Sequence, residues 1–365
     1  MSQSKIFLES EITPLAPEEC RFHVIPVPYE ATVSYGGGTR LGPQAIIEAS
    51  SQLEAWTGRN LPLEHGIYTW PEVDCAGDAE KVLGNIEAAV QTALERGPQG
   101  PSPDSLRNKR VASESASDAI KSSATTNDTL AADSSSKSCC AAPCLPVALG
   151  GEHTVTLGLL RALKKRYGHF GVIQFDAHAD LRNSYEGSPY SHACVMRRAV
   201  DDLGLNLFQI GVRSLSPEEV EFRKLRGIRH LDARDARFPL AGSIPGCTQG
   251  RMTDKQCEDT AKNVAGQNSG SGQGGLLDGL IPADFPELVF LTFDIDALDA
   301  SLMPATGTPE PGGLFWWDAL RLIEASLGGR TCIGFDVVEL APLAGLHAPN
   351  FTTARLVYEI MGMFG

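Results

Sequence analysis

The sequence predicts one α/β domain in which a mostly parallel β-sheet is covered by helices on both faces. Three observations lead to this expectation. Short apolar runs alternate with segments of helical periodicity, which is the pattern of repeated strand–helix units. The apolar runs are continuous, as in strands that are buried on both faces. The chain has 365 residues and is 42% hydrophobic, so it can form a substantial core.

The individual elements follow in chain order. Continuous apolar runs predict strands at residues 21–27, 145–149, 172–175, 206–212, 228–231, 288–293 and 331–335. Helical periodicity predicts helices that begin at residues 43 and 217, and helices over residues 79–96, 154–167, 191–203, 317–327 and 352–364. Pro43 suits a first helical turn, where no N–H partner is needed. In the second helix, Val82, Ile86 and Val90 recur on one side.

Two regions depart from this pattern. Residues 97–143 are rich in Ser, Ala, Thr, Asp and Pro, and residues 237–282 contain the segment GQNSGSGQGG. The first region has too few large apolar residues to offset the entropy of ordering the chain, and the second also resembles an insertion or a long loop. We therefore expect low-complexity insertions at about 97–143 and 237–282 within a single domain that spans residues 1–365.

Charge and composition exclude several classes of partner. The formal net charge is -14, and no dense Lys/Arg tract is present, so nucleic acid is not an expected partner. The N-terminus lacks the pattern of a secretory signal, and no apolar run approaches the length of a membrane span. These features favour a cytoplasmic protein that does not bind membranes.

The nine cysteines do not predict a disulfide framework. Their number is odd and their spacing is scattered, so most are expected to be free thiols. Cys139, Cys140 and Cys144 form a cluster that offers soft metal ligands. No second Cys or His group lies at zinc-finger spacing, so an incidental cluster is the favoured interpretation.

Metal-ligand residues directly follow one of the buried strands. The segment GVIQFDAHADLR places Asp176, His178 and Asp180 at alternate positions after the apolar run. In an extended chain such side chains project to one side, so two carboxylates and an imidazole would crowd together. A lone D-x-H-x-D pattern also occurs in surface turns with capping carboxylates, so this segment alone does not decide between the two interpretations.

A second strand end makes the metal site the better interpretation. Asp294 and Asp296 follow the run LVFLTF at the same two-residue spacing, and His153 and Glu339 follow two further strands. In open α/β sheets ligands bind beyond the carboxyl ends of the strands, so these residues are expected at one rim. His153 alone would more often be a capping or core residue. The preceding glycines, which permit close backbone approach, favour a ligand.

The number of charges fits two divalent cations. Four aspartates carry four negative charges, which two divalent ions balance. Oxygen-rich ligation with about one imidazole for each ion favours two Mn²⁺, with Ni²⁺, Fe²⁺ or Co²⁺ as alternatives. Two such ions about 3.5 to 4 Å apart can lower the pKa of a shared water towards neutrality. The sequence therefore predicts a binuclear hydrolytic centre.

Six short motifs together resemble the ureohydrolase superfamily, which contains arginase and agmatinase. They are GGEH at 150–153, FDAHADLR at 175–182, YSHA at 190–193, FDIDALD at 293–299, GTPEPGG at 307–313 and GFDVVE at 334–339. The resemblance extends from about residue 22 to the C-terminus, apart from the insertions expected at about 97–143 and 237–282. It implies a single three-layer α/β/α domain with a binuclear manganese site. It also implies hydrolysis of a guanidinium group to urea and an amine.

The resemblance also implies roles for individual residues. Asp176 and Asp294 would bridge the two ions, with His153 and Asp180 on one ion and His178 and Asp296 on the other. The catalytic residues implied are His192, Glu339 and Asp180. His192 would deliver a proton to the departing amine, Glu339 would hold the guanidinium, and Asp180 would accept or pass a proton while remaining a ligand.

The motifs are similar to those of the agmatinase branch, which implies cleavage of agmatine to putrescine and urea. Alternatives are hydrolysis of guanidinobutyrate, guanidinopropionate, free guanidine, arginine or formiminoglutamate. An alternative of another class is a catalytically silent paralogue with a regulatory role, although such proteins usually lose ligands and all six are present here. A metal-storage protein would not need His192 or Glu339. The resemblance further implies a homo-oligomer, a trimer or a hexamer.

Overall fold

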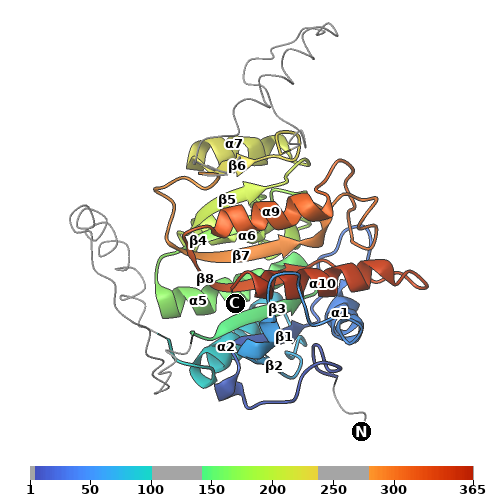
Figure 1. Ribbon diagram of the computed structural model, residues 1–365. Coiled ribbons are helices and arrows are strands. Elements are labelled where there is room, and N and C mark those ends of the chain that lie inside the picture. Colours follow the sequence, from blue (N-terminus) through green and yellow to red (C-terminus); the bar gives the residue numbers. More distant parts are fainter. Residues whose placement is uncertain (1–4, 101–141, 237–278, 365) are drawn as a thin grey trace, which may run out of the picture.

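The chain forms a three-layer α/β/α domain around one eight-stranded parallel sheet (Figure 1). This computed structural model describes residues 5–100, 142–236 and 279–364. The strand order is β2-β1-β3-β8-β7-β4-β5-β6, and all pairs of neighbours are parallel. The predicted fold class is therefore confirmed.

The elements alternate along the chain as the sequence predicts. The strands are β1 (Phe22–Val27), β2 (Ile67–Thr69), β3 (Leu145–Gly150), β4 (Gly171–Phe175), β5 (Asn206–Ile210), β6 (Arg229–Leu231), β7 (Leu288–Asp294) and β8 (Thr331–Val338). The helices are α1 (Gly42–Ser50), α2 (Ala79–Arg96), α5 (Thr156–Tyr167), α6 (Val195–Asp201), α7 (Pro217–Arg226), α9 (Trp316–Leu327) and α10 (Ala348–Gly362). Short 3₁₀ turns precede α5 and α6 and follow β7.

The strand order places four carboxyl ends next to one another. Strands β1 to β3 build one half of the sheet and β4 to β6 the other, and β7 and β8 then fill the space between β3 and β4. Ligands of open α/β sheets bind where the strand order changes in this way. The ends of β3, β8, β7 and β4 carry the residues that the sequence singles out, so the topology brings these residues to one rim.

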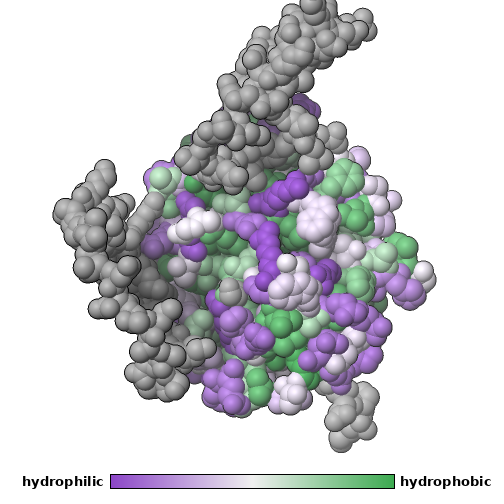
Figure 2. All heavy atoms as spheres, in the orientation of Figure 1, coloured by the Kyte–Doolittle hydropathy of each residue, from purple (hydrophilic) through white to green (hydrophobic). Residues whose placement is uncertain are grey.

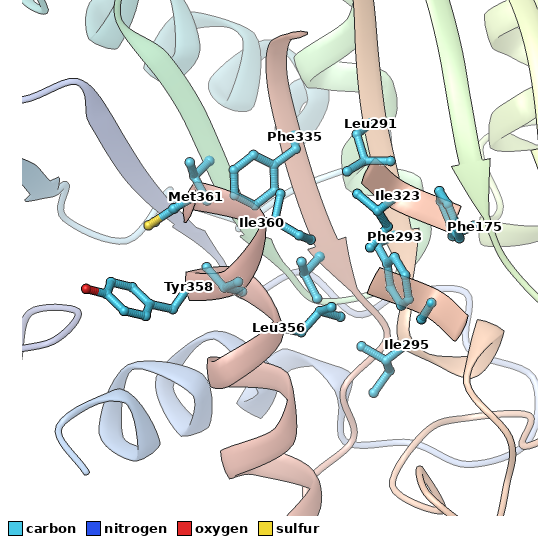
Figure 3. Close-up of a cluster of buried hydrophobic side chains, with 14 of the residues drawn as sticks. Phe175, Leu291, Phe293, Ile295, Ile323, Phe335, Leu356, Tyr358, Ile360 and Met361 are labelled. Carbon is cyan, nitrogen blue, oxygen red and sulfur yellow. The ribbon is translucent and has the colours of Figure 1, made fainter. Parts of the chain in front are cut away.

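Two hydrophobic cores hold the layers together. Helices α1, α9 and α10 cover one face of the sheet, and α2, α5, α6 and α7 cover the other. Figure 3 shows part of the first core, where side chains of β4, β7 and β8 meet α9 and α10. There the Phe175 and Phe293 rings stack with their centroids 5.3 Å apart. Because each ring comes directly before a ligand-bearing strand end, this packing helps to fix both ends.

Several element boundaries differ from the sequence prediction, and one strand was not predicted. Strand β8 continues to Val338, although Asp336 interrupts its apolar run; this buried carboxylate accepts a hydrogen bond from the Thr156 hydroxyl at 2.8 Å. Helix α10 begins at Ala348 rather than residue 352, because Pro349 occupies the first turn, where proline is tolerated. Edge strand β2 was not predicted, since three residues are too few to show a period.

The predicted insertions lie mostly outside the described residues, so they remain predictions. Cys139 and Cys140 also lie outside them. Cys144 is buried, and its Sγ lies 3.4 Å from the Ala93 carbonyl oxygen, inside the core rather than at a surface cluster. The five cysteines within the described residues are free thiols, as expected.

Among the described residues, no helix combines the length and apolarity that a bilayer crossing requires. The face formed by α9 and α10 carries intermixed hydrophobic and hydrophilic residues (Figure 2). The cytoplasmic location and the oligomeric state remain predictions.

Candidate metal centre

The eight predicted site residues converge at the rim formed by β3, β8, β7 and β4. Seven of them line one cavity of about 240 Å³, and the eighth, Asp176, is fully buried beside them. The members on the cavity wall are His153, His178, Asp180, His192, Asp294, Asp296 and Glu339. They come from segments up to 186 residues apart, and the arrangement depends on the insertion of β7 and β8 between β3 and β4.

The first cluster surrounds His153. Its Nδ1 lies 2.9 Å from an oxygen of Asp180, 3.1 Å from one of Asp176 and 3.4 Å from one of Asp294. Nδ1 is nevertheless a buried atom without a hydrogen-bond partner among the described residues. The other ring nitrogen, Nε2, lies 2.9 Å from Thr292 Oγ1 and can donate its proton there. Burial opposes protonation of this ring, but Asp176, Asp180 and Asp294 raise its pKa well above the usual range, so Nδ1 carries a proton when no metal is bound. A metal ion could replace that proton while Nε2 donates to Thr292, which is the arrangement of a metal ligand.

The second cluster shares Asp176 with the first. His178 Nδ1 lies 3.0 Å from Asp296 Oδ2 and 3.7 Å from Asp176 Oδ1, while Asp176 Oδ2 faces His153. The two clusters, His153–Asp176–Asp180 and Asp176–His178–Asp296, each present three ligand atoms close together. The geometry therefore supplies two adjacent His/Asp triads joined by one carboxylate.

The electrostatics of this cluster require cations. Burial opposes protonation of His178, but Asp296 and Asp176 raise its pKa to about 12. Burial and the neighbouring Asp176 raise the pKa of Asp180 to about 7. Burial, together with Asp296 and Asp176, also raises the pKa of Asp294 well above its usual range. The carboxylates can all ionise together only when cations balance them, so the residues fit a pair of divalent ions.

A chain of buried side chains supports Asp176. The Gln174 amide donates to Asp176 Oδ2 at 2.7 Å, and Gln209 donates to Gln174 Oε1 at 2.6 Å. Arg223 in turn donates to Gln209 Oε1 at 2.7 Å. Each amide is oriented by the next, so the guanidinium on α7 helps to orient a ligand carboxylate at the end of β4.

Backbone strain is found at two of the site residues. Asp180 and Glu339 have φ values of 53° and 69°, in a left-handed region that such residues seldom adopt. Close packing fixes the neighbouring backbone, because a Cβ atom on Gly151 would lie 1.9 Å from the Tyr29 carbonyl oxygen. Only glycine fits there, which bears out the expected close approach before His153. The Glu339 carboxylate also accepts the His153 N–H at 2.6 Å.

His192 lies on the cavity wall at the start of a 3₁₀ turn that Ser191 caps. Burial lowers its pKa, so the neutral ring is the favoured form near pH 7. Its Nδ1 lies 3.1 Å from the hydroxyl of Thr32, which comes from the loop after β1. A neutral imidazole on the wall of an acidic cavity is suited to proton transfer.

Arg213 has a supporting role that the sequence prediction missed. Its guanidinium donates to the backbone carbonyls of Asp296 at 2.6 Å, Glu310 at 2.8 Å, Gly211 at 3.0 Å and Pro311 at 3.2 Å. It thus ties together the loops that follow β5 and β7 and the loop before α9. Arg213 lies just beyond the end of β5, as the predicted ligands lie beyond the ends of their strands. That position was the signal by which the sequence could have revealed it.

Comparison with known proteins agrees with this geometry. The sequence profile of the arginase family matches residues 20–103, 104–241 and 280–363. The chain belongs to the arginase family. All of the first region expected as an insertion, residues 97–143, falls within the matched ranges, whereas residues 242–279 of the second lie outside them.

Several arginase-family relatives cover almost the whole chain. The N(1)-aminopropylagmatine ureohydrolase of Synechocystis sp. is 33% identical, with 100% of this chain and 95% of the relative covered. The agmatinase of Pyrococcus horikoshii is 27% identical, with 97% of this chain and 96% of the relative covered. The crystal structure of agmatine ureohydrolase of Thermoplasma volcanium superposes with a TM-score of 0.65 at 26% identity, covering 100% and 94% of the two chains.

These relatives and the two triads identify the enzyme class. The chain is a metal-dependent ureohydrolase of the agmatinase type within the arginase family. The predicted family and the predicted enzymatic nature are thereby confirmed. A catalytically silent paralogue is not supported, because both triads are complete.

Proposed function

We propose that this enzyme hydrolyses the guanidinium group of agmatine, or of a closely related agmatine derivative, to urea and an amine. The observation that carries this proposal is the position of Glu339. Its carboxylate is buried and lines the same cavity as both triads, although it belongs to neither. A carboxylate in that position can bind a planar guanidinium with two hydrogen bonds.

The distances support the part of the proposed ligand assignment that involves Asp176, and the resemblance to ureohydrolases supplies the place of Asp294. His153 and Asp180 would hold one ion, His178 and Asp296 the other, with Asp176 and Asp294 shared between them. Oxygen-rich ligation favours Mn²⁺. When bound, the ions would supply Lewis-acid chemistry that makes a water reactive at neutral pH. Asp180 would both ligate an ion and accept or pass a proton.

The side chains then account for the remaining requirements of the reaction. Glu339 would orient the guanidinium carbon towards the triads. His192 would give a proton to the amine nitrogen as the C–N bond breaks, because an amine leaves readily only when protonated. Water adds its oxygen to the guanidinium carbon, so the products are urea and a protonated amine.

N(1)-aminopropylagmatine is a second candidate substrate. Three relatives, from Synechocystis sp., Thermococcus kodakarensis and Thermus thermophilus, carry its name and are 31% to 33% identical to this chain. Both compounds present the same guanidinium to Glu339, and they differ only at the distal end. The mouth of the cavity, where Tyr35 is 85% exposed, would accommodate that difference.

One assay tests the proposal. Urea release is measured after loading with Mn²⁺ or Ni²⁺, on agmatine, N(1)-aminopropylagmatine, arginine and guanidinobutyrate, and formamide release is measured on formiminoglutamate. We expect turnover of one or both agmatine compounds, with kcat/KM at least about 100-fold above that for arginine. Preference for a carboxylate-bearing substrate would refute the proposed substrate class. No urea from any compound would refute the reaction. Homo-oligomerisation and a cytoplasmic location remain part of the proposal, to be checked by light scattering and by fractionation.

A further inference from the structure

The loop after β1 forms one wall of the cavity and is anchored by two carboxylates. Val33, Ser34 and Tyr35 from this loop line the cavity. At its far end, the Glu30 carboxylate accepts the backbone N–H groups of Gly38 and Arg40 at 3.0 and 2.9 Å. At its near end, the loop is held by Glu152, which directly precedes the ligand His153 in the sequence.

Glu152 is fully buried and accepts four short hydrogen bonds. The donors are the backbone N–H groups of Ala31 and Thr32, both at 2.6 Å, and the hydroxyls of Thr32 at 2.8 Å and Thr154 at 2.7 Å. An ionised carboxylate only accepts hydrogen bonds. The hydroxyl proton of Thr32 is therefore directed at Glu152 and is not available to any other neighbour.

This direction determines the state of the His192 ring. Thr32 Oγ1 lies 3.1 Å from His192 Nδ1 and also accepts the His192 backbone N–H at 3.1 Å. Because the Thr32 hydroxyl donates its hydrogen bond to Glu152, a hydrogen bond between Oγ1 and His192 Nδ1 requires that Nδ1 carries the proton. In the neutral ring, Nε2 is then the nitrogen with a free lone pair. The Ser191 hydroxyl is a weaker neighbour of Nδ1, at 3.4 Å.

We propose that Thr32 and Glu152 are positioning residues that hold His192 in its Nδ1–H tautomer, so that Nε2 exchanges protons with the reactants. The catalytic part of this inference rests on the proposed function. During turnover Nε2 would take one proton of the attacking water and give it to the amine nitrogen as the C–N bond breaks, while the other proton would pass through Asp180. Nδ1 would keep its proton, in a hydrogen bond to Thr32 Oγ1, throughout. The ring therefore need not rotate between the two proton transfers.

The test compares two substitutions of Thr32 in the full-length protein. Thr32→Val keeps the shape of the side chain but removes the hydroxyl, and Thr32→Ser keeps the hydroxyl. If valine is not tolerated, Thr32→Ala serves the same purpose. Nitrogen NMR of ¹⁵N-histidine-labelled protein reports the tautomer directly, and the chain has only 8 histidines, so the spectrum of His192→Asn identifies the resonance. Urea kinetics and metal content are measured on the same samples.

We expect Thr32→Val to convert His192 to a mixture of tautomers and to lower kcat by about tenfold or more, with KM within about twofold and metal content unchanged. Thr32→Ser should restore the tautomer and most of kcat. Thr154→Val removes another hydrogen bond to Glu152 without touching His192, so it should leave the tautomer unchanged.

A Thr32→Val protein that keeps the Nδ1–H tautomer overturns the inference. A Thr154→Val protein that loses the tautomer to the same extent also overturns it. Loss of any hydrogen bond to Glu152 would then change the ring through the general structure, and not through the hydroxyl of Thr32. If wild-type protein releases no urea, the proposed function fails, but the NMR comparison still decides whether Thr32 sets the tautomer.

Discussion

Replacing Arg213 with lysine should weaken both the fold and one of the two metal positions. The guanidinium makes four hydrogen bonds of 3.2 Å or less to backbone carbonyls, of which the bond to Asp296 at 2.6 Å is the shortest. A Cβ atom on Gly313 would lie 2.7 Å from its Nη2, so the guanidinium packs closely against that backbone. Lysine presents a single nitrogen and can keep about two of these bonds.

The size of the effect follows from the bonds that are lost. Two charge-assisted hydrogen bonds at about 1.5 kcal/mol each amount to about 3 kcal/mol of unfolding free energy. Because Asp296 belongs to the triad of His178, metal affinity at that position should fall by about 10- to 100-fold, as for other residues that orient ligands. The triad of His153 should bind metal nearly as in the wild type.

Denaturant unfolding of metal-free protein measures the first quantity, and titration with Mn²⁺ measures the second. Arg321→Lys is a matched control, because Arg321 is exposed and its ion-pair distance to Asp318 is 3.9 Å; its unfolding free energy should change by less than about 0.5 kcal/mol. If Arg213→Lys unfolds like the wild type and binds two equivalents of Mn²⁺ with unchanged affinity, the supporting role of Arg213 is wrong.

Four further predictions concern the metals, the substrate and stability. Glu339→Gln should keep two metal ions by elemental analysis but lose most urea production, whereas Asp294→Asn should lose activity and loosen both ions; retained turnover in Asp294→Asn would contradict the proposed mechanism. Metal binding at pH 7 should release protons, because His178 with a pKa of about 12 is protonated without metal and Asp180 with a pKa of about 7 is partly so. Calorimetry in buffers of different ionisation enthalpy measures that proton release. If no protons are released, His178 and Asp180 do not hold protons in the metal-free site, and the prediction is wrong. Finally, burial lowers the pKa of His23 below its usual 6.5, and its Nδ1 accepts the Trp70 indole N–H at 3.0 Å. As pH falls, the imidazole of His23 is protonated in the unfolded chain before it is protonated in the folded protein. The stability contributed by neutral His23 is therefore present above pH 6.5 and is lost as pH falls below that value. In denaturant unfolding, His23→Gln should lose less stability than the wild type between about pH 7.5 and pH 5.5.

The sequence allowed the ligands to be predicted because of where they lie. A carboxylate placed directly after a continuous apolar run, as Asp176 and Asp294 are, can be recognised without knowing the partner strand. The parallel sheet then requires such ends to meet at one rim. Helix boundaries were predicted within a few residues wherever apolar periodicity was strong, as over 79–96.

The supporting residues could not be predicted in the same way. Arg213 acts on carbonyls 83 and 97 residues further along the chain, and Thr32 acts on a ring 160 residues away. Their roles depend on which loops meet above the sheet, and no local pattern encodes that meeting. Glu152 was visible within GGEH, but the sequence did not reveal which N–H groups it accepts. Local chemistry therefore predicted the candidate ligands, and tertiary contacts revealed the residues that orient them.

The charges of the site also explain why Glu339 is best assigned to the substrate. Asp176, Asp180, Asp294 and Asp296 carry four negative charges, which two divalent cations balance. Glu339 brings a fifth, and burial raises the pKa of its carboxyl well above its usual range, so the ionised form needs a further positive charge. One of its oxygens accepts the His153 N–H, and a Cβ atom on Gly307 would lie 3.9 Å from the other, on the side of the cavity. A guanidinium would place its positive charge beside Glu339, whereas a neutral substrate would leave this buried carboxylate without a partner of opposite charge.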